Sequence, residues 1–378
     1  MIRKIHYLIF CLFLSVEVLP QSDEDIVRFE DLNFNSYFEE MAFYNFSTGS
    51  DDMLMLFAAI DPDVNEKIFR EFEKDFQQEL ARMKSRKFLR AKPDKQVNLL
   101  YNYVNTQVLT RYQEKILFPH LFVNGTFNCL TASAFYGFIL DSLGIPYTFM
   151  ETYDHVHPVA YPGEKQVKIE TTDRITGIQY YDEKLKNKFV NYLVQVDQIS
   201  KDEYYSRSTE DLFNEYFLPQ SNVGLKELAG LHYMNDALYK FDVGHFADAF
   251  EQIKKAYFIY PSERMLTIFQ FILANTLAET EFTDETYGNL LVYVSRLPVE
   301  RINPSDIGVG FAILTERVLF NLSMTEFYDS FFEYLDENME EGEVKDIISY
   351  YYYFLRGKSF VAQYMFRDGL DYFIKAYY

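Results

Sequence analysis

Cysteine and tryptophan are the residues that this sequence uses least: it contains two cysteines and no tryptophan among 378 residues. Cys11 lies in an apolar stretch near the N-terminus, and Cys129 lies well inside the chain. If the N-terminal stretch is removed, a single cysteine is left and no internal disulfide can form. Such a lone thiol is either a buried packing residue or a reactive group.

Positive charge is also scarce. The chain has 36 Lys and Arg against 57 Asp and Glu, a formal net charge of -21. A nucleic acid would be repelled by this surface, so we exclude a nucleic-acid partner. His120, His232 and His245 are scattered without metal-ligand spacing, and no glycine-rich phosphate loop is present. We therefore expect no cofactor and no metal.

Long apolar runs are absent except at the N-terminus. Arg3 and Lys4 precede a mostly apolar stretch over residues 7–18, which is the layout of a secretory signal. The stretch is too short for a transmembrane helix, and no second run is long enough to span a membrane. We predict a signal peptide over residues 1–22. The mature protein is then exported, to the periplasm, cell envelope or medium, with no integral membrane span.

Aromatic residues are abundant, at 18% of the chain, with 37 Phe and 32 Tyr. Hydrophobic residues make up 48%, which is enough to bury a core and argues against disorder. The length favours two or more folding units. Large aromatic side chains in this number suit helical packing.

The first part of the chain changes its hydrophobic period after Gly144. Helical spacing predicts a helix over residues 64–88, started by residues 61–63, and a second helix from Pro93 to about residue 112. Beyond Gly144, alternation predicts antiparallel strands over residues 145–150, 155–161 and 166–171. Helices followed by a small antiparallel sheet predict an α+β domain, which we place at residues 23–220.

Residues 221–378 are predicted to be helical, without a convincing strand. The segment over residues 244–261 resembles the second half of a tetratricopeptide repeat, with small residues that let helices approach. In the segment over residues 366–377, Gly369, Phe373 and Ala376 have the same spacing as Ala249, Ile253 and Ala256. We therefore predict an all-α, tetratricopeptide-like repeat domain after the α+β domain.

Cys129 occupies the position expected of a catalytic thiol. The turn at Asn124 and Gly125 leads directly into an apolar, helix-favouring stretch that stops at Gly144. Unpaired N–H groups and the helix dipole in the first turn favour a thiolate. Asn128 is placed to cap this helix or to orient the site. An oxyanion would be held by the backbone N–H of Cys129 and by the side chain of Asn128 or Asn124.

His155 and Glu170 follow Cys129 on two predicted strands. An imidazole at His155, beside the helix that begins at Cys129, would take the thiol proton. His157 lies on the same strand face by the two-residue period and is a rival for this role. Glu170 would hold the imidazole in orientation, as a triad carboxylate does, with Asp173 as the alternative.

Together these segments resemble the core of a transglutaminase-like (papain-related) cysteine domain. The resemblance rests on residues 128–134, 143–147, 155–156 and 169–172. It implies that Cys129 is the nucleophile, His155 the base and Glu170 the orienting carboxylate.

The sequence departs from the family pattern at two positions. The acidic residue is Glu170 where Asp is common, and His157 replaces an aromatic residue often found two positions after the histidine. The helical second part is similar to that of exported bacterial proteins in which such a domain precedes tetratricopeptide-like repeats.

Two functions are consistent with this sequence. The first is cysteine-dependent acyl transfer on amide or peptide bonds of a protein or peptide substrate, with hydrolysis favoured over transamidation because no amine-binding feature is visible. The second is a catalytically inactive transglutaminase-like module that acts as a protein-interaction scaffold. In both cases the helical repeats are expected to bind a protein partner.

Overall fold

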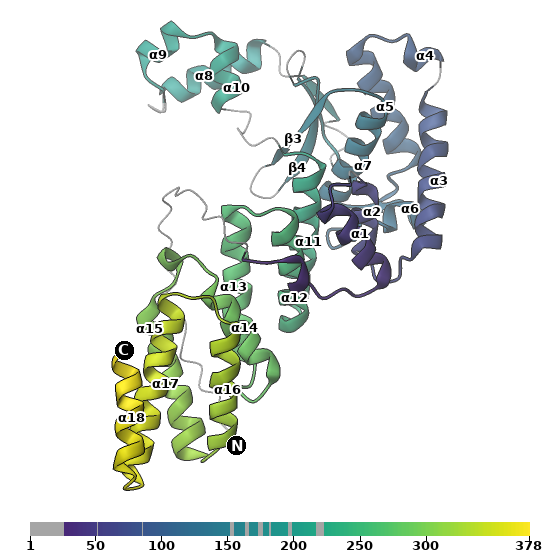
Figure 1. The fold of residues 1–378 in the computed structure, drawn as a ribbon. Helices are drawn as coiled ribbons and strands as arrows, with labels where there is room; N and C mark the ends of the chain where they lie inside the picture. The colour runs from purple at the N-terminus through teal and green to yellow at the C-terminus, as the bar shows by residue number, and fades with distance from the viewer. Residues whose placement is uncertain are drawn as a thin grey trace. The chain divides into compact units, whose positions relative to one another are not determined.

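The computed structural model describes residues 26–50, 52–84, 86–151, 155–162, 166–172, 177–180, 183–195, 199–216 and 223–378. The predicted signal over residues 1–22 lies outside this part of the chain. The described residues belong to two compact units. We call residues Leu32–Val243 and Glu251–Leu266 the α+β unit, and residues 26–31, Gly244–Phe250 and Thr267–Tyr378 the helical unit. Figure 1 shows the elements of both.

The α+β unit is mostly helical, and its strands lie between an early and a late group of helices. The helices are α1 (Tyr37–Ser47), α2 (Met53–Ala59), α3 (Glu66–Met83), α4 (Arg86–Leu89), α5 (Pro93–Gln107), α6 (His120–Asn124), α7 (Cys129–Ser142), α8 (Glu183–Gln195), α9 (Lys201–Ser206), α10 (Thr209–Tyr216) and α11 (Leu225–Asp242). The strands are β1 (Arg111–Tyr112), β2 (Thr126–Phe127), β3 (Tyr147–Glu151), β4 (Val156–Ala160), β5 (Val167–Ile169) and β6 (Ile178–Tyr180). Helices α12 (Phe246–Ile259) and α13 (Glu263–Glu279) contribute residues to both units.

Strands β3 to β6 form an antiparallel sheet in chain order. The first three agree with the predicted strands to within a few residues, and β6 was not predicted. Helices together with a small antiparallel sheet agree with the predicted α+β class. Strands β1 and β2 form a separate, parallel pair just before α7.

Three predicted helix boundaries are wrong, because the helix predicted over residues 64–88 both starts late and ends early, at Met83. Helix α3 begins at Glu66, because the side chain of Asn65 accepts the N–H of Ile68 at 3.2 Å and so acts as the N-cap. The predicted helix from Pro93 to about residue 112 ends at Gln107. The chain must leave the helix there, since Arg111 already pairs with Thr126 in the β1–β2 ladder.

Helix α7 is the central helix of the α+β unit and is buried over most of its length. Phenylalanine rings fill the space around it: the ring centroids of Phe57, Phe118 and Phe138 lie 5.1–5.7 Å apart. At Gly137, a Cβ atom would lie 2.6 Å from the Phe149 ring of β3, so helix and sheet approach closely. The opposite face of the sheet, which carries Met150 and Val159, packs in a core with residues of α8 and α10.

The helical unit consists of helices joined by short connections. They are the 3₁₀ helices η1 (Phe29–Asp31) and η2 (Val299–Arg301), the π-helix η3 (Glu316–Asn321), and α14 (Glu285–Ser295), α15 (Pro304–Thr315), α16 (Thr325–Asn338), α17 (Glu343–Ala362) and α18 (Phe366–Tyr377). Helices α17 and α18 form a close hairpin in which a Cβ atom on Gly357 would lie 3.2 Å from the carbonyl oxygen of Gly369. Among the described residues, no helix has the length and apolar character required to cross a membrane.

The hairpins α11–α12 and α17–α18 share a local design. In each hairpin a small residue of the second helix follows the turn residue by five positions. Ala249 follows Gly244 in the first hairpin, and Gly369 follows Tyr364 in the second. Both turn residues adopt a left-handed backbone, with φ of 83° and 63° respectively. The turn geometry is therefore retained in the second hairpin, although its residue is not glycine.

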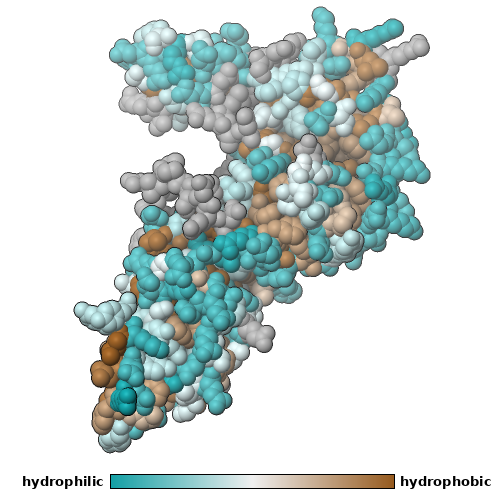
Figure 2. Space-filling view, in the orientation of Figure 1, coloured by the Kyte–Doolittle hydropathy of each residue, from teal (hydrophilic) through white to brown (hydrophobic). Residues whose placement is uncertain are grey.

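The outward face of α18 is apolar. Phe366, Leu370 and Ile374 recur every four residues and are 63%, 57% and 47% exposed. Figure 2 shows the corresponding brown surface at the lower left, where Figure 1 shows α18.

Gly125 should be the glycine on which the start of α7 depends most. Its φ is +68°, and a Cβ atom there would meet the backbone oxygen of Val108 and lie 2.6 Å from Thr110 Oγ1. Gly125→Ala should destabilise the protein by about 2–5 kcal/mol, from backbone strain and overpacking together. Urea unfolding measures this change.

Gly144→Ala is the matched control for that experiment. Gly144 has a φ of +67°, but nothing lies within 4 Å of its Cβ position. It should therefore cost about 1–2 kcal/mol, from backbone strain alone. Equal losses in the two variants would contradict the packing argument for Gly125.

Candidate active site

Cys129 is the first residue of α7, and the helix start is fixed by a reciprocal cap. Asn128 Oδ1 accepts the N–H of Thr131 at 2.9 Å, and Thr131 Oγ1 accepts the N–H of Asn128 at 2.9 Å. The helix-capping role considered for Asn128 is thus the one that it has. The N–H groups of Cys129 and Leu130 belong to the first turn, which offers them no intrahelical acceptor.

Strand β1 and Gln113 lie beside β2, the strand that leads to Cys129. Tyr112 pairs with Phe127, and the N–H of Gln113 donates to the Phe127 carbonyl at 2.8 Å. Burial, and then the charge of Cys129, raise the pKa of Tyr112, and the same causes raise the pKa of Tyr239 to about 12. The phenol rings of Tyr112 and Tyr239 therefore both lie within electrostatic range of the Cys129 sulfur.

The structure brings His155 between Cys129 and Glu170. His155 immediately precedes β4, and its Nε2 lies 3.0 Å from Glu170 Oε1. Its side chain also hydrogen-bonds with that of Cys129. The His155 side chain is 24% exposed and that of Glu170 is 9% exposed, so the pair is largely shielded from water. The three residues predicted to form a site do lie together, while their catalytic role stays a prediction.

The two partners of the imidazole favour its charged form. The hydrogen bond with Cys129 and then that with Glu170 raise the pKa of His155 to about 9, against the opposing effect of burial. For Glu170, burial favours the neutral acid. The bond to His155, its charge and the bonds from Thr172 outweigh that effect and hold the pKa of Glu170 below its usual range.

These shifts define the pH range over which the pair stabilises the fold. The contribution of His155 is complete below its unfolded pKa of about 6.5 and is lost as the pH rises through about 9. The contribution of Glu170 is complete above its unfolded pKa of about 4.5 and is lost as the pH falls toward its lowered folded pKa. Both contributions are complete between these two unfolded values.

Glu170 is held by two further residues that the sequence reasoning missed. Lys168 Nζ lies 3.3 Å from Glu170 Oε2. Thr172 donates its N–H and its hydroxyl to Oε1 at 3.2 and 3.0 Å. The two-residue period of the strand already put Lys168 on the same face as Glu170, so this signal was present in the sequence.

His157, the rival base, is buried behind His155. It is 3% exposed, and neither ring nitrogen has a hydrogen-bond partner among the described residues, so it does not bond the Cys129 thiol. Burial, then the charges of Lys168 and His155, lower the pKa of His157 to about 3. Asp173, the rival carboxylate, lies outside the described residues.

One predicted oxyanion donor, the side chain of Asn128, is corrected by its contacts. Asn128 Nδ2 donates to the carbonyl of Glu114 at 2.9 Å, so both ends of this amide serve the local fold. Asn124 Oδ1 accepts the N–H of Thr126 at 3.0 Å and shapes the turn. The backbone N–H of Cys129 and the Nδ2 group of Asn124 therefore stay the predicted donors.

No family model matches this chain, and no curated protein or solved structure is significantly similar to it. The resemblance to transglutaminase-like domains therefore rests on the residues themselves.

One of the remaining histidines, His232, serves packing. His232 is buried, and its Nε2 accepts the N–H of Phe118 at 3.1 Å. Burial lowers its pKa to about 3, so it stays neutral. Within the described ranges, no three His, Cys, Asp or Glu side chains are grouped so that they could hold a metal ion.

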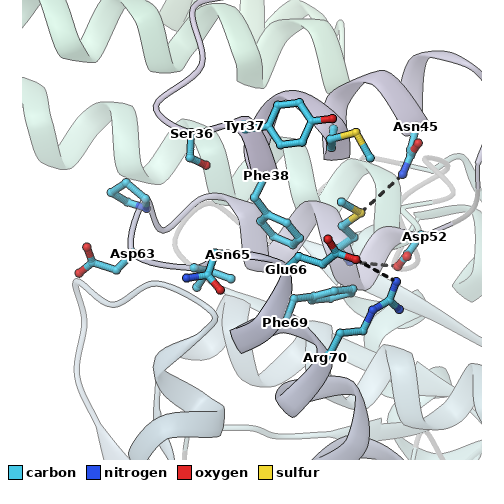
Figure 3. Close-up of a pocket in the computed structure, with 14 residues that line it drawn as sticks. Ser36, Tyr37, Phe38, Asn45, Asp52, Asp63, Asn65, Glu66, Phe69 and Arg70 are labelled. Atoms are coloured by element: carbon cyan, nitrogen blue, oxygen red, sulfur yellow. Dashed lines mark hydrogen bonds and ion pairs between the residues drawn. The ribbon is translucent and has the colours of Figure 1, made fainter.

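A hollow of about 460 Å³ lies apart from this site, between the segments that carry α1, α2 and α3. Figure 3 shows Phe38 and Phe69 among its lining side chains, with Arg70 beside Glu66, and the two phenylalanine ring centroids lie 5.3 Å apart. Its lining contains neither cysteine nor histidine, so it does not provide the nucleophilic chemistry expected at Cys129.

Glu170→Gln should lower the pKa of His155 from about 9 toward 6.5, because the amide removes one of the two groups that favour the imidazolium. An NMR titration of the His155 ring protons measures this shift. Glu151→Gln is the matched control, since Glu151 is a carboxylate on the neighbouring strand that pairs with Arg264 instead. An unchanged His155 titration in Glu170→Gln would contradict the described contact.

Proposed function

We propose that this chain catalyses cysteine-dependent acyl transfer on amide or peptide bonds, and that its α+β unit is a transglutaminase-like (papain-related) domain. The observation that carries the proposal is the contact of His155 with both Cys129 and Glu170. Acyl transfer by a thiol requires a nucleophile, a base that contacts it and a carboxylate that orients the base. Cys129, His155 and Glu170 make contacts in this order.

In the proposed reaction, His155 takes the thiol proton and the Cys129 sulfur attacks the substrate carbonyl carbon. The resulting oxyanion accepts a hydrogen bond from the Cys129 backbone N–H, a type of contact worth about 3–4 kcal/mol in the transition state. The C–N bond then breaks, and His155 gives its proton to the departing amine. Water, deprotonated by His155, attacks the thioester, which releases the acid and restores the thiol.

Hydrolysis is favoured over transamidation by the openness of the approach. Tyr112, beside Cys129, is 52% exposed, and Cys129 itself is partly exposed. Water therefore has access to the acyl group without a dedicated binding site. We expect a protein or peptide as the acyl donor.

The helical region is proposed to act as a tetratricopeptide-like platform for a protein partner. Two hairpins with the same turn geometry and small-residue spacing support the repeat assignment. The apolar outward face of α18 supports a binding role. Export through the signal over residues 1–22 remains part of the same proposal.

Alkylation kinetics test the proposed nucleophile. Iodoacetamide should label Cys129 rapidly at about pH 6, because His155 stores the thiol proton and leaves a thiolate. His155→Ala should slow this labelling by roughly tenfold or more at about pH 6 and much less at about pH 9.5, where the solvent removes the proton. Cys129→Ser, read by peptide mass spectrometry, identifies the labelled residue. Slow labelling of the folded wild-type protein at about pH 6 would contradict the proposal.

A further inference from the structure

Burial of the His157 ring destabilises the folded protein. It is 3% exposed, and both nitrogens of its ring lack a hydrogen-bond partner among the described residues. Each buried polar group without a partner destabilises the folded state relative to an apolar group of the same shape. An apolar ring would fill this space without that cost, so the position of the ring calls for a physical explanation.

The ring of His157 lies against the ring of His155. The two centroids are 5.6 Å apart and the planes make an angle of 28°, a stacked arrangement. A ring packed face to face against a fixed neighbour loses that contact when it rotates. The stack thus limits the rotation of the His155 ring.

Apolar neighbours hold His157 in place on the face that packs toward α8 and α10. Met150 stands directly opposite it on β3, and Val159 follows it two residues later on β4. Both belong to the core that also contains Leu193 of α8 and Phe213 of α10. His157 is therefore fixed by packing, while His155, next to it on the same face, reaches the more exposed end of the strand.

The charged groups around His157 keep it neutral. Lys168 of β5, Glu170 just after β5 and His155 just before β4 act on it electrostatically, while Cys129 of α7 contacts His155. On β3, the residue directly opposite is the uncharged Met150, and Glu151 is engaged with Arg264. Burial and the two cationic neighbours lower the pKa of His157 to about 3. It consequently does not exchange protons with His155 near neutral pH.

We propose that His157 is a positioning residue for His155: its neutral, buried ring forms a platform that holds the base between Cys129 and Glu170. This inference rests on the proposed function and extends it to a residue that does not touch the substrate. The stacked ring face is what acts, so an aromatic ring without nitrogens should substitute for it.

Two variants and one control test the platform by alkylation with iodoacetamide. His157→Ala should lower the rate at about pH 6 by roughly tenfold and leave the rate at about pH 9.5 unchanged, since only the assembled pair supplies thiolate at the lower pH. His157→Phe should keep both rates within about twofold of wild type and raise the urea midpoint, because it removes two buried nitrogens without partners. Met150→Ala, which opens the same core, should lower stability without changing the ratio of the two rates.

An equal change of the rate ratio in His157→Ala and Met150→Ala would overturn the platform, because a general loosening of the core would then explain both. Failure of His157→Phe to restore the ratio would also overturn it.

A second measurement separates this inference from the proposed function. NMR relaxation of the His155 ring reports its mobility whether or not Cys129 is reactive. The ring should be rigid in the wild type and in His157→Phe, and mobile in His157→Ala. Unchanged mobility in His157→Ala would refute the platform. Slow wild-type labelling at about pH 6 with a rigid ring would refute the proposed function alone.

Discussion

The contact between His155 and Glu170 is the interaction on which the rest of the site depends. It fixes one side of the imidazole, so that the other side meets the Cys129 thiol. The contact requires the β4–β5 register in which Val159 pairs with Lys168, since this register puts Glu170 on the face that carries His155 and His157. A slip of one residue would turn Glu170 to the other face of the sheet and separate the two groups.

A second constraint fixes the thiol, and it is local. The left-handed Gly125 turns the chain out of α6, and the pairing of Asn128 with Thr131 starts α7 at Cys129. Because the helix is buried almost all round, its direction is set by the core and not by the site. Burial of α7 against β3 then brings its first turn to the head of β4, where His155 lies.

Short sequence patterns predicted the start of α7 and three strands correctly, but not the start of α3, which Asn65 caps. The turn, cap and glycine stop around α7 are read from adjacent residues, and the alternation after Gly144 predicted β3, β4 and β5. Strand β6, with three residues, is too short for a period to be recognised. The end of α5 was missed because it depends on pairing between Arg111 and Thr126, not on a local stop signal.

Contacts between distant residues account for what the sequence left open. The choice between His155 and His157 depends on the core that covers His157, to which α8 and α10 contribute. The side chain of Asn128 was one of two predicted alternatives for an oxyanion donor, but its Nδ2 donates to the carbonyl of Glu114. That carbonyl also accepts a hydrogen bond from Tyr239, 125 residues away in the sequence, which no local pattern reveals.

Formation of an acyl-enzyme is the measurement that tests the central claim most directly. The protein is mixed with an activated aryl ester, the released phenol is followed in time, and intact mass spectrometry counts the acyl groups. The account predicts a burst of one phenol per chain with the acyl group on Cys129, absent in Cys129→Ser and strongly slowed in His155→Ala. A folded protein whose Cys129 reacts with iodoacetamide but gives no burst with any acyl donor would contradict it.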